Sequence, residues 1–151
     1  MKLSDAGLEL LKRSEGFRSH IYKDVNGFPT IGYGHRLLHP DSFSDGIGEK
    51  QAGEILVSDV HVAEQAVERL VEVALTQGQF DALVDFCFNL GAGRLASSTL
   101  LKVLNSMRYE DAALQLLCWD LAGGKENAGL KARREAEFAL WNGAMKHQAA
   151  A

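Results

Sequence analysis

The sequence predicts an α+β fold that is mainly helical, with a small N-terminal β-hairpin lobe, a long connecting helix and a helical lobe. Two strand-like runs, HIYKDV and FPTIGYG, flank Asn26-Gly27, which is a strong hairpin signal. Between Ala52 and Val71 the apolar residues recur mostly at spacings of three and four, as on one face of a long helix. The run TQGQFDALVDFCFNLGAG is apolar on nearly all sides, which is typical of a helix at the centre of a lobe.

Length and composition fit a single domain. The chain has 151 residues, and we expect one domain over 1–151 with a small lobe at about 15–48 and a helical lobe at about 75–145 completed by the N-terminal helix. Two lobes joined by a helix make a cleft. No apolar run approaches the roughly 18 residues that a membrane helix needs. The start, MKLSDAGLELLKR, does not have the pattern of a signal peptide, so we expect folding in a cytoplasm.

The first helix should place a carboxyl group at its end. Ser4 or Asp5 can cap its N-terminus, and Leu8 and Leu11 share one face. The helix should end near Ser14-Glu15-Gly16, because glycine commonly terminates helices. The negative end of the helix dipole disfavours a second negative charge there, which suits a carboxyl group that has to act as an acid.

The hairpin allows two registers. A two-residue loop at Asn26-Gly27 pairs Asp24 with Pro29 and puts Thr30 on the opposite face. A three-residue loop that also includes Phe28 pairs Asp24 directly with Thr30. We favour the three-residue loop if the two side chains act together.

The rest of the chain should be irregular at 36–48 and helical afterwards. We expect a break at Gly78, then helices at about 97–106, 109–121 and 130–142, with Gly123-Gly124 between the last two. The trailing HQAAA should fray. Both tryptophans, Trp119 and Trp141, should lie in the core.

Charge and cysteine usage exclude several classes of function. Residues 1–50 carry seven basic and seven acidic groups, residues 51–100 two and seven, and residues 101–151 seven and six, which gives a net charge of −4. A chain of this charge is a poor general binder of nucleic acid. Cys87 and Cys118 lie in apolar runs and are expected to be buried, reduced thiols. We predict no metal site and no cofactor.

Glu15 and Asp24 suggest cleavage of a glycosidic bond. That reaction needs one carboxylic acid to protonate the leaving oxygen and a carboxylate across the sugar ring. Glu15, Asp24 and Thr30 are separated by nine and six positions, and a helix end, a hairpin and a glycine-rich strand converge on them.

The segment EGFRSHIYKDVNGFPTIGYGH resembles the phage lysozyme family, the endolysin muramidases of glycoside hydrolase family 24. The family pattern is a Glu that closes the first helix, then YxD, then TIGxGH. ALTQGQFDALVDFCFNLGAG, STLLKVLN and GLKARREAEFALW are similar to the family's later segments, so the resemblance covers roughly residues 5–142. Many relatives are strongly basic, whereas this chain is acidic.

The resemblance implies a lysozyme-like fold and a peptidoglycan hydrolase that cuts between N-acetylmuramic acid and N-acetylglucosamine. It assigns Glu15 as the general acid, Asp24 as the carboxylate across the ring, and Thr30 as the hydroxyl that helps hold the attacking water. Because Asp24 comes with a hydroxyl group, we predict that a water molecule attacks and that the anomeric configuration inverts.

Further residues are assigned to substrate binding or to structure. We predict that Gly32 and Gly34 let a sugar approach, with simple strand bends as the alternative. The resemblance implies that Asn89 and Gly91 line the cleft from its other side, and a helix cap is the alternative for this pair. Arg133 or Arg134 is predicted to pair with Glu15 or to meet the peptide stem, with a solvated helix face as the alternative. His35 and Asp59 are predicted to form a structural ion pair between the lobes.

Two alternatives remain open at this point, a lytic transglycosylase and a catalytically inactive wall-binding phage component. Both Asp24 and Thr30 disfavour the first, and the presence of Glu15 and Asp24 disfavours the second. The family also implies a monomer that stays in the host cytoplasm until a separate pore protein, a holin, releases it to the periplasm and cell wall. The chain shows no second wall-binding domain, which favours a thin, Gram-negative wall as target.

Overall fold

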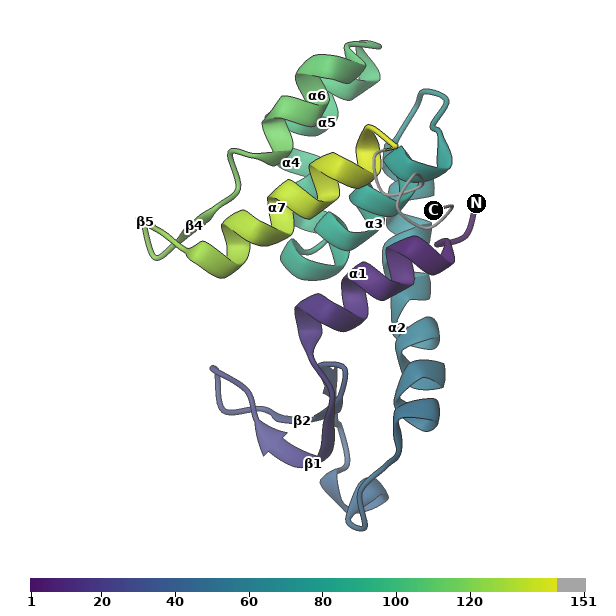
Figure 1. The fold of residues 1–151 in the computed structure, drawn as a ribbon, viewed down its shortest axis with the longest axis vertical. Coiled ribbons are helices and arrows are strands. Elements are labelled where there is room, and N and C mark those ends of the chain that lie inside the picture. Colours follow the sequence, from purple (N-terminus) through teal and green to yellow (C-terminus); the bar gives the residue numbers. More distant parts are fainter. Residues whose placement is uncertain (144–151) are drawn as a thin grey trace. The chain divides into compact units, whose positions relative to one another are not determined.

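The computed structural model describes residues 1–143, and the chain divides into two compact units. One unit is Leu11–Val62, and the other combines Met1–Leu10 with the chain from Ala63 onward. The first unit contains the strands β1 (Arg18–Lys23), β2 (Pro29–Gly32) and β3 (His35–Arg36) and the short helix η1 (Pro40–Phe43). The unit boundaries fall inside the helices α1 (Asp5–Glu15) and α2 (Glu49–Leu70). Both helices are labelled in Figure 1. The fold is mainly helical with small antiparallel sheets, as predicted.

Helix α1 begins and ends where the sequence predicts. The hydroxyl of Ser4 accepts a hydrogen bond from the backbone N–H of Gly7 at 3.2 Å, which caps the N-terminus. At the other end the N–H of Gly16 donates to the carbonyl of Lys12 at 3.0 Å, and Gly16 has a φ of 73°. A glycine accepts this left-handed conformation without strain, so the helix stops directly after Glu15.

The β-sheet has the order β1-β2-β3 and is antiparallel throughout; Figure 1 labels β1 and β2. Tyr22 pairs with Thr30, and the N–H of Asp24 donates to the carbonyl of Phe28 at 2.9 Å. The favoured register, with Asp24 opposite Thr30, is therefore wrong by two positions. Asp24 closes the turn itself, and the loop is residues 25–27. Because the shift is an even number, Asp24 and Thr30 still belong to the same face of the hairpin.

The β-bearing unit has its own small core. Ile31, Leu37, Ile47 and Ala52 are buried together, and Phe17, Ile21, Tyr33, Phe43 and Ile55 pack against them. The register between β1 and β2 shifts between Arg18 and Tyr22, so β1 is bulged over this core. The segment 36–48 is largely irregular, as predicted, apart from η1 and the end of β3.

The helical unit is built from short helices around α3 (Gln77–Leu90). They are α4 (Ala92–Ser97), α5 (Thr99–Asn105), α6 (Tyr109–Leu116) and α7 (Ala128–Trp141). Gly78 does not mark the break, because α2 ends at Leu70 and Thr76 caps α3. Gly78 lies in the first turn of α3, where a side-chain carbon would overlap the carbonyl oxygen of Leu140. Its role is the close packing of α3 on α7.

Two further expectations for this unit are wrong. The helix predicted over 109–121 ends at Leu116, and a small hairpin of β4 (Leu121–Ala122) and β5 (Lys125–Glu126) follows. Gly123 and Gly124, with φ of 58° and 80°, form its two-residue turn and lie between α6 and α7, as predicted. Cys87 is buried as expected, whereas Cys118 is exposed, and both thiols are free. The predicted fraying of the C-terminal tail lies outside the described residues.

Candidate active site

The carboxyl group of Glu15 lies against the backbone of Gly34. Glu15 is the last residue of α1, and Gly34 lies in the turn between β2 and β3 with a φ of 76°. A methyl carbon built on Gly34 would be 3.0 Å from Oε2 of Glu15. Any side chain at this position would therefore crowd the carboxyl group. Gly34 is exposed and Glu15 is partly buried, and we call the space that the missing side chain of Gly34 leaves beside the carboxyl group the notch.

Asp24 is held by the backbone of the turn that it starts. Its Oδ1 accepts hydrogen bonds from the N–H groups of Asn26 and Phe28, each at 2.9 Å. Its Oδ2 lies 3.6 Å from Nη2 of Arg36. The hydrogen bond from Phe28 is the largest influence and lowers the pKa of Asp24. Burial opposes it, and the bond from Asn26 and then the charge of Arg36 lower the pKa further. Asp24 is therefore an anion across the neutral range.

Thr30 is the buried member of the group. It is only 3% exposed, and its hydroxyl donates to the carbonyl of Phe28 at 2.9 Å. Phe28 thus takes hydrogen bonds from Thr30 and Asp24 and donates one to Asp24. The hydroxyl proton of Thr30 is committed, so the oxygen offers its lone pairs to a third group.

The contacts of the other candidate residues in this unit, Gly32, His35 and Asp59, indicate structural roles. Gly32 is buried, and a carbon built on it would meet Ala52 at 3.2 Å and Ile47 at 3.3 Å, so the core accounts for its small size. His35 Nδ1 and Asp59 Oδ2 are 2.7 Å apart, which confirms the predicted pair. Both residues belong to the Leu11–Val62 unit, so the pair joins β3 to α2 within one unit rather than between lobes.

In the helical unit the predicted residues form a buried polar network. Arg133 donates from Nε and Nη2 to the two carboxylate oxygens of Asp85 at 2.9 and 3.0 Å. Arg134 donates from Nη2 to Oδ1 of Asn89 at 2.8 Å and to Oε1 of Glu137 at 2.7 Å. Both arginines are buried, so the alternative of a solvated helix face is wrong. Pairing of either arginine with Glu15 stays a prediction.

Burial shapes the protonation of this network. The pKa of Glu137 is raised well above its ordinary value. Burial is the largest cause, and a hydrogen bond to Asp85 and the negative charge of Asp85 add to it. Burial likewise lowers the pKa of Arg134, which still leaves a cation at neutral pH. Its guanidinium carbon lies 5.2 Å from the ring centroid of Phe86. Gly91 links α3 to α4 with a φ of 95°, which fits the helix-cap alternative.

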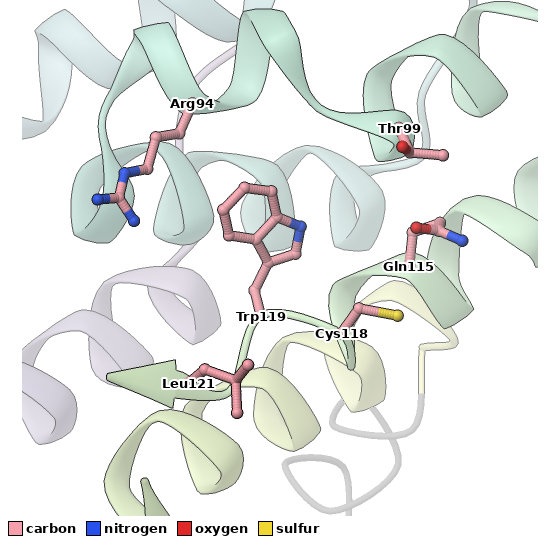
Figure 2. A pocket seen from close by; sticks show the side chains of 6 residues that line it. All are labelled: Arg94, Thr99, Gln115, Cys118, Trp119 and Leu121. Atoms are coloured by element: carbon pink, nitrogen blue, oxygen red, sulfur yellow. The ribbon is translucent and has the colours of Figure 1, made fainter. Parts of the chain in front are cut away.

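A separate open pocket of about 410 Å³ lies in the helical unit (Figure 2). The indole of Trp119 stands at its centre, with Arg94 on one side and Gln115 and Thr99 on the other. Cys118 and Leu121 complete the lining. Trp119 is half-buried and packs edge-on against Phe86 with ring centroids 5.4 Å apart, whereas Trp141 is in the core as predicted.

Neither a metal centre nor a membrane span is found among residues 1–143. No group of three or more His, Cys, Asp or Glu side chains in this range could hold an ion. No helix in this range is both long and apolar enough to cross a membrane.

Comparison with known proteins identifies the family. The model of the family described as phage lysozyme matches residues 12–137, a range that includes Glu15, Asp24 and Thr30. The chain belongs to the phage lysozyme family. It is 43% identical over 145 residues to an endolysin of Bacillus phage B103, covering 93% of this chain and 54% of that protein. The chain thus spans about half the length of that relative.

Two further matches extend over nearly the whole of both proteins. An endolysin of Salmonella phage P22 is 40% identical over 144 residues, covering 93% of this chain and 98% of that protein. A crystal structure of a P22 lysozyme mutant superposes with a TM-score of 0.85 at 38% identity, covering 94% of this chain and 99% of that one. The phage lysozyme fold and family predicted from the sequence are both confirmed.

Sequence reasoning overlooked Arg36, Asp85 and Glu137. Arg36 directly follows TIGYGH, at the point where the predicted strand ended, and a third strand was not expected. Asp85 and Glu137 stand in apolar or helical runs, where acidic residues are usually solvated. Asp85 in the otherwise apolar ALVDFCF was the available signal, because a charge in a buried helix needs a partner.

Proposed function

We propose that this phage lysozyme is a peptidoglycan hydrolase that cleaves the β-1,4 bond between N-acetylmuramic acid and N-acetylglucosamine. Glu15 is the general acid that protonates the leaving oxygen. The observation that carries the proposal is the notch at Gly34, where the absence of a side chain leaves room for the Glu15 carboxyl group. The same sheet presents Asp24 and Thr30, and membership of the family supports this chemistry.

Hydrogen bonding at Thr30 and Asp24 suits the binding of a water molecule. The hydroxyl group of Thr30 donates a hydrogen bond to the carbonyl oxygen of Phe28, so the Thr30 oxygen can only accept further hydrogen bonds. Asp24 is an acceptor too, and Oδ2 is the oxygen that the turn amides leave unused. A water that donates one hydrogen to each would turn a lone pair toward the substrate. Thr30 and Asp24 thereby act as a water-holding pair.

A held water implies inversion at the anomeric carbon. Inverting enzymes keep their two carboxyl groups about 6.5–9.5 Å apart to admit a water, whereas retaining enzymes keep them about 5–5.5 Å apart. The turn amides stabilise Asp24 as an anion and make it a weak nucleophile, which favours attack by water. Proton NMR of fresh digests of a soluble wall fragment should show the α-anomer first. An initial β-anomer would make Asp24 the nucleophile, and a 1,6-anhydro sugar would identify a transglycosylase.

Glu15→Gln provides the decisive test. Glutamine is nearly isosteric but cannot deliver a proton, and general acid catalysis supplies about 10²–10⁴-fold. We expect wall lysis, followed as turbidity loss on purified sacculi, to fall at least about 100-fold. The thermal unfolding midpoint should be unchanged, because Glu15 lies at a helix end. Lysis above about one hundredth of wild type would overturn the assignment of Glu15.

The wider setting is also proposed. We infer a single catalytic domain composed of a small and a helical lobe, acting as a monomer on bacterial peptidoglycan. Asn89, Gly91, Arg133 and Arg134, all in the helical unit, are proposed as further substrate-binding residues. Release from the host cytoplasm to the periplasm and wall is proposed to depend on a holin. Lysis of whole cells that requires holin co-expression would support this route.

A further inference from the structure

Arg36 shares a face of the sheet with Asp24 and Thr30. Arg36 pairs with Thr30 across β2 and β3, and Thr30 pairs with Tyr22 across β1 and β2. Directly paired residues point to the same side of a sheet, and so do residues two positions apart on one strand. Asp24 directly follows β1, two positions beyond Tyr22, and its Oδ2 lies 3.6 Å from Nη2 of Arg36. The cation is therefore built into the same surface as the proposed water-holding pair.

The guanidinium group of Arg36 is held in place by stacking on the ring of Phe28. Its central carbon lies 3.9 Å from the ring centroid of Phe28, which is close for a cation stacked on an aromatic face. Phe28 itself is fixed by backbone hydrogen bonds to Asp24 on both its N–H and its carbonyl. Arg36 is 54% exposed, yet its stacking on Phe28 keeps the positive charge next to the turn at residues 25–27.

Asp24 has two kinds of partner, one on each oxygen. Oδ1 is used by the amides of the turn, and Nη2 of Arg36 lies 3.6 Å from Oδ2. Within residues 1–143, Arg36 is the charged side chain that the structure places against this carboxylate. The distance is too long for a strong hydrogen bond, so Oδ2 keeps lone pairs for a water while it feels the positive charge.

We propose that Arg36 is a positioning residue for Asp24, which keeps its carboxylate ionised and its Oδ2 directed to the water site as the pH falls. This inference rests on the proposed function, because it assigns Arg36 to the same hydrolysis. Only the ionised carboxylate can accept a hydrogen bond from water at both oxygens. Arg36 should therefore add to the effect of the turn amides and hold the acid limb of the pH–rate profile at lower pH.

Two variants at Arg36 and one matched control test the proposal. Arg36→Gln removes the charge and keeps a polar side chain, and Arg36→Lys keeps the charge without the planar group. Arg18→Gln is the control: Arg18 is also an exposed sheet cation stacked on an aromatic ring, 4.4 Å from the Tyr22 centroid, but it has no contact with Asp24. It corrects for the general loss of one positive charge toward an anionic wall.

Two readouts separate this inference from the proposed function. Carbon-13 NMR of the Asp24 carboxyl group during an acid titration needs no activity, and kcat/KM on a soluble wall fragment gives the pH–rate profile. We expect Arg36→Gln to move both the carboxyl titration and the acid limb to higher pH, Arg36→Lys to stay close to wild type, and Arg18→Gln to move neither. Unfolding midpoints of all three variants verify the fold.

Each outcome decides one question. An Asp24 titration that is the same in Arg36→Gln and wild type overturns the inference, whatever the activity. A shifted titration with an unshifted acid limb also overturns it, because Arg36 would then act on Asp24 without a role in the reaction. Full activity in Asp24→Asn would instead overturn the proposed role of Asp24 in the reaction. The Asp24 titration in wild type and Arg36→Gln, which both keep the carboxyl group, would still show whether Arg36 acts on Asp24.

Discussion

The two units of the molecule satisfy their acidic side chains in different ways. In the β-bearing unit, Asp24 is held by backbone amides of its own turn and keeps one oxygen toward solvent. In the helical unit, both oxygens of Asp85 are bound by Arg133, and both side chains are buried. The first arrangement is local and the second joins two helices, α3 and α7. The first leaves an oxygen available for the proposed chemistry, and the second ties the fold together.

Removing the negative charge should have different consequences at Asp24 and at Asp85. Loss of the Asp24 charge leaves turn amides that an Asn carbonyl can still satisfy, so chemistry can be removed without unfolding. Loss of the Asp85 charge leaves a buried guanidinium without its partner, which is strongly unfavourable. Variants in the two units should therefore separate into those that change activity and those that change stability.

Asp85→Ala should have the largest effect. Removing one partner of a buried ion pair costs about 3–5 kcal/mol, and Asp85 is 0% exposed. Denaturant unfolding of Asp85→Ala against wild type measures this loss, with Asp24→Asn as the matched control in the other unit. We expect the control to lose under about 1 kcal/mol, because an Asn carbonyl can still accept the turn hydrogen bonds. Equal losses in the two variants would remove the contrast between the units.

Gly34→Ala should mainly damage activity. The added methyl group would lie 3.0 Å from Oε2 of Glu15 and displace the carboxyl group. A misplacement of about 1 Å can cost about 10²-fold in rate. The left-handed φ of 76° should add a stability cost of roughly 1–2 kcal/mol. Gly27→Ala, at a φ of 83° with no atom near the added carbon, carries the same strain without the crowding. Equal activities of the two variants would show that the notch is irrelevant.

The local motifs of the β-bearing unit could be read from the sequence, whereas its register could not. The end of α1 at Glu15 and the turn at Gly27 follow from glycine placement. The pairing was misjudged because Asp24 was treated as a strand residue, when its side chain binds the amides of Asn26 and Phe28 and starts the turn. Local side-chain bonds of this kind compete with the ladder and are not visible in a hydrophobic pattern.

The helical unit shows the opposite balance. Its core helix α3 was evident from composition, but the partners Asp85 of Arg133 and Asn89 of Arg134 were not, because they lie 48 and 45 residues away in the chain. A short helix and a small hairpin, α4 and β4–β5, also escaped prediction. Segments this short carry too few residues for a periodic pattern. Tertiary packing determines them.

Glu137→Gln tests the buried network of the helical unit through the pH dependence of its unfolding free energy. The pKa of Glu137 is raised in the folded state, so its neutral form is favoured there. Its contribution to stability is complete below the ordinary value of 4.5 and is lost as the pH rises through the raised value. Glutamine imitates the neutral form, accepting from Arg134 and donating toward Asp85. The variant should gain stability relative to wild type as the pH rises. A constant difference in unfolding free energy between pH 4 and 9 would contradict the shift.

The pair of His35 and Asp59 lies between these extremes and should have the smallest effect. The two side chains are 2.7 Å apart, but each is 29% exposed, so solvent screens their attraction. A double-mutant cycle of His35→Ala and Asp59→Ala should give a coupling free energy below about 1 kcal/mol. Activity at neutral pH should remain within a few-fold of wild type, because the pair fastens β3 to α2 and takes no part in the proposed chemistry. A coupling above about 2 kcal/mol would be outside the range of exposed pairs. Such a coupling would mean that the β-bearing unit also contains a charged pair as strong as a buried one, which would contradict the contrast between the two units.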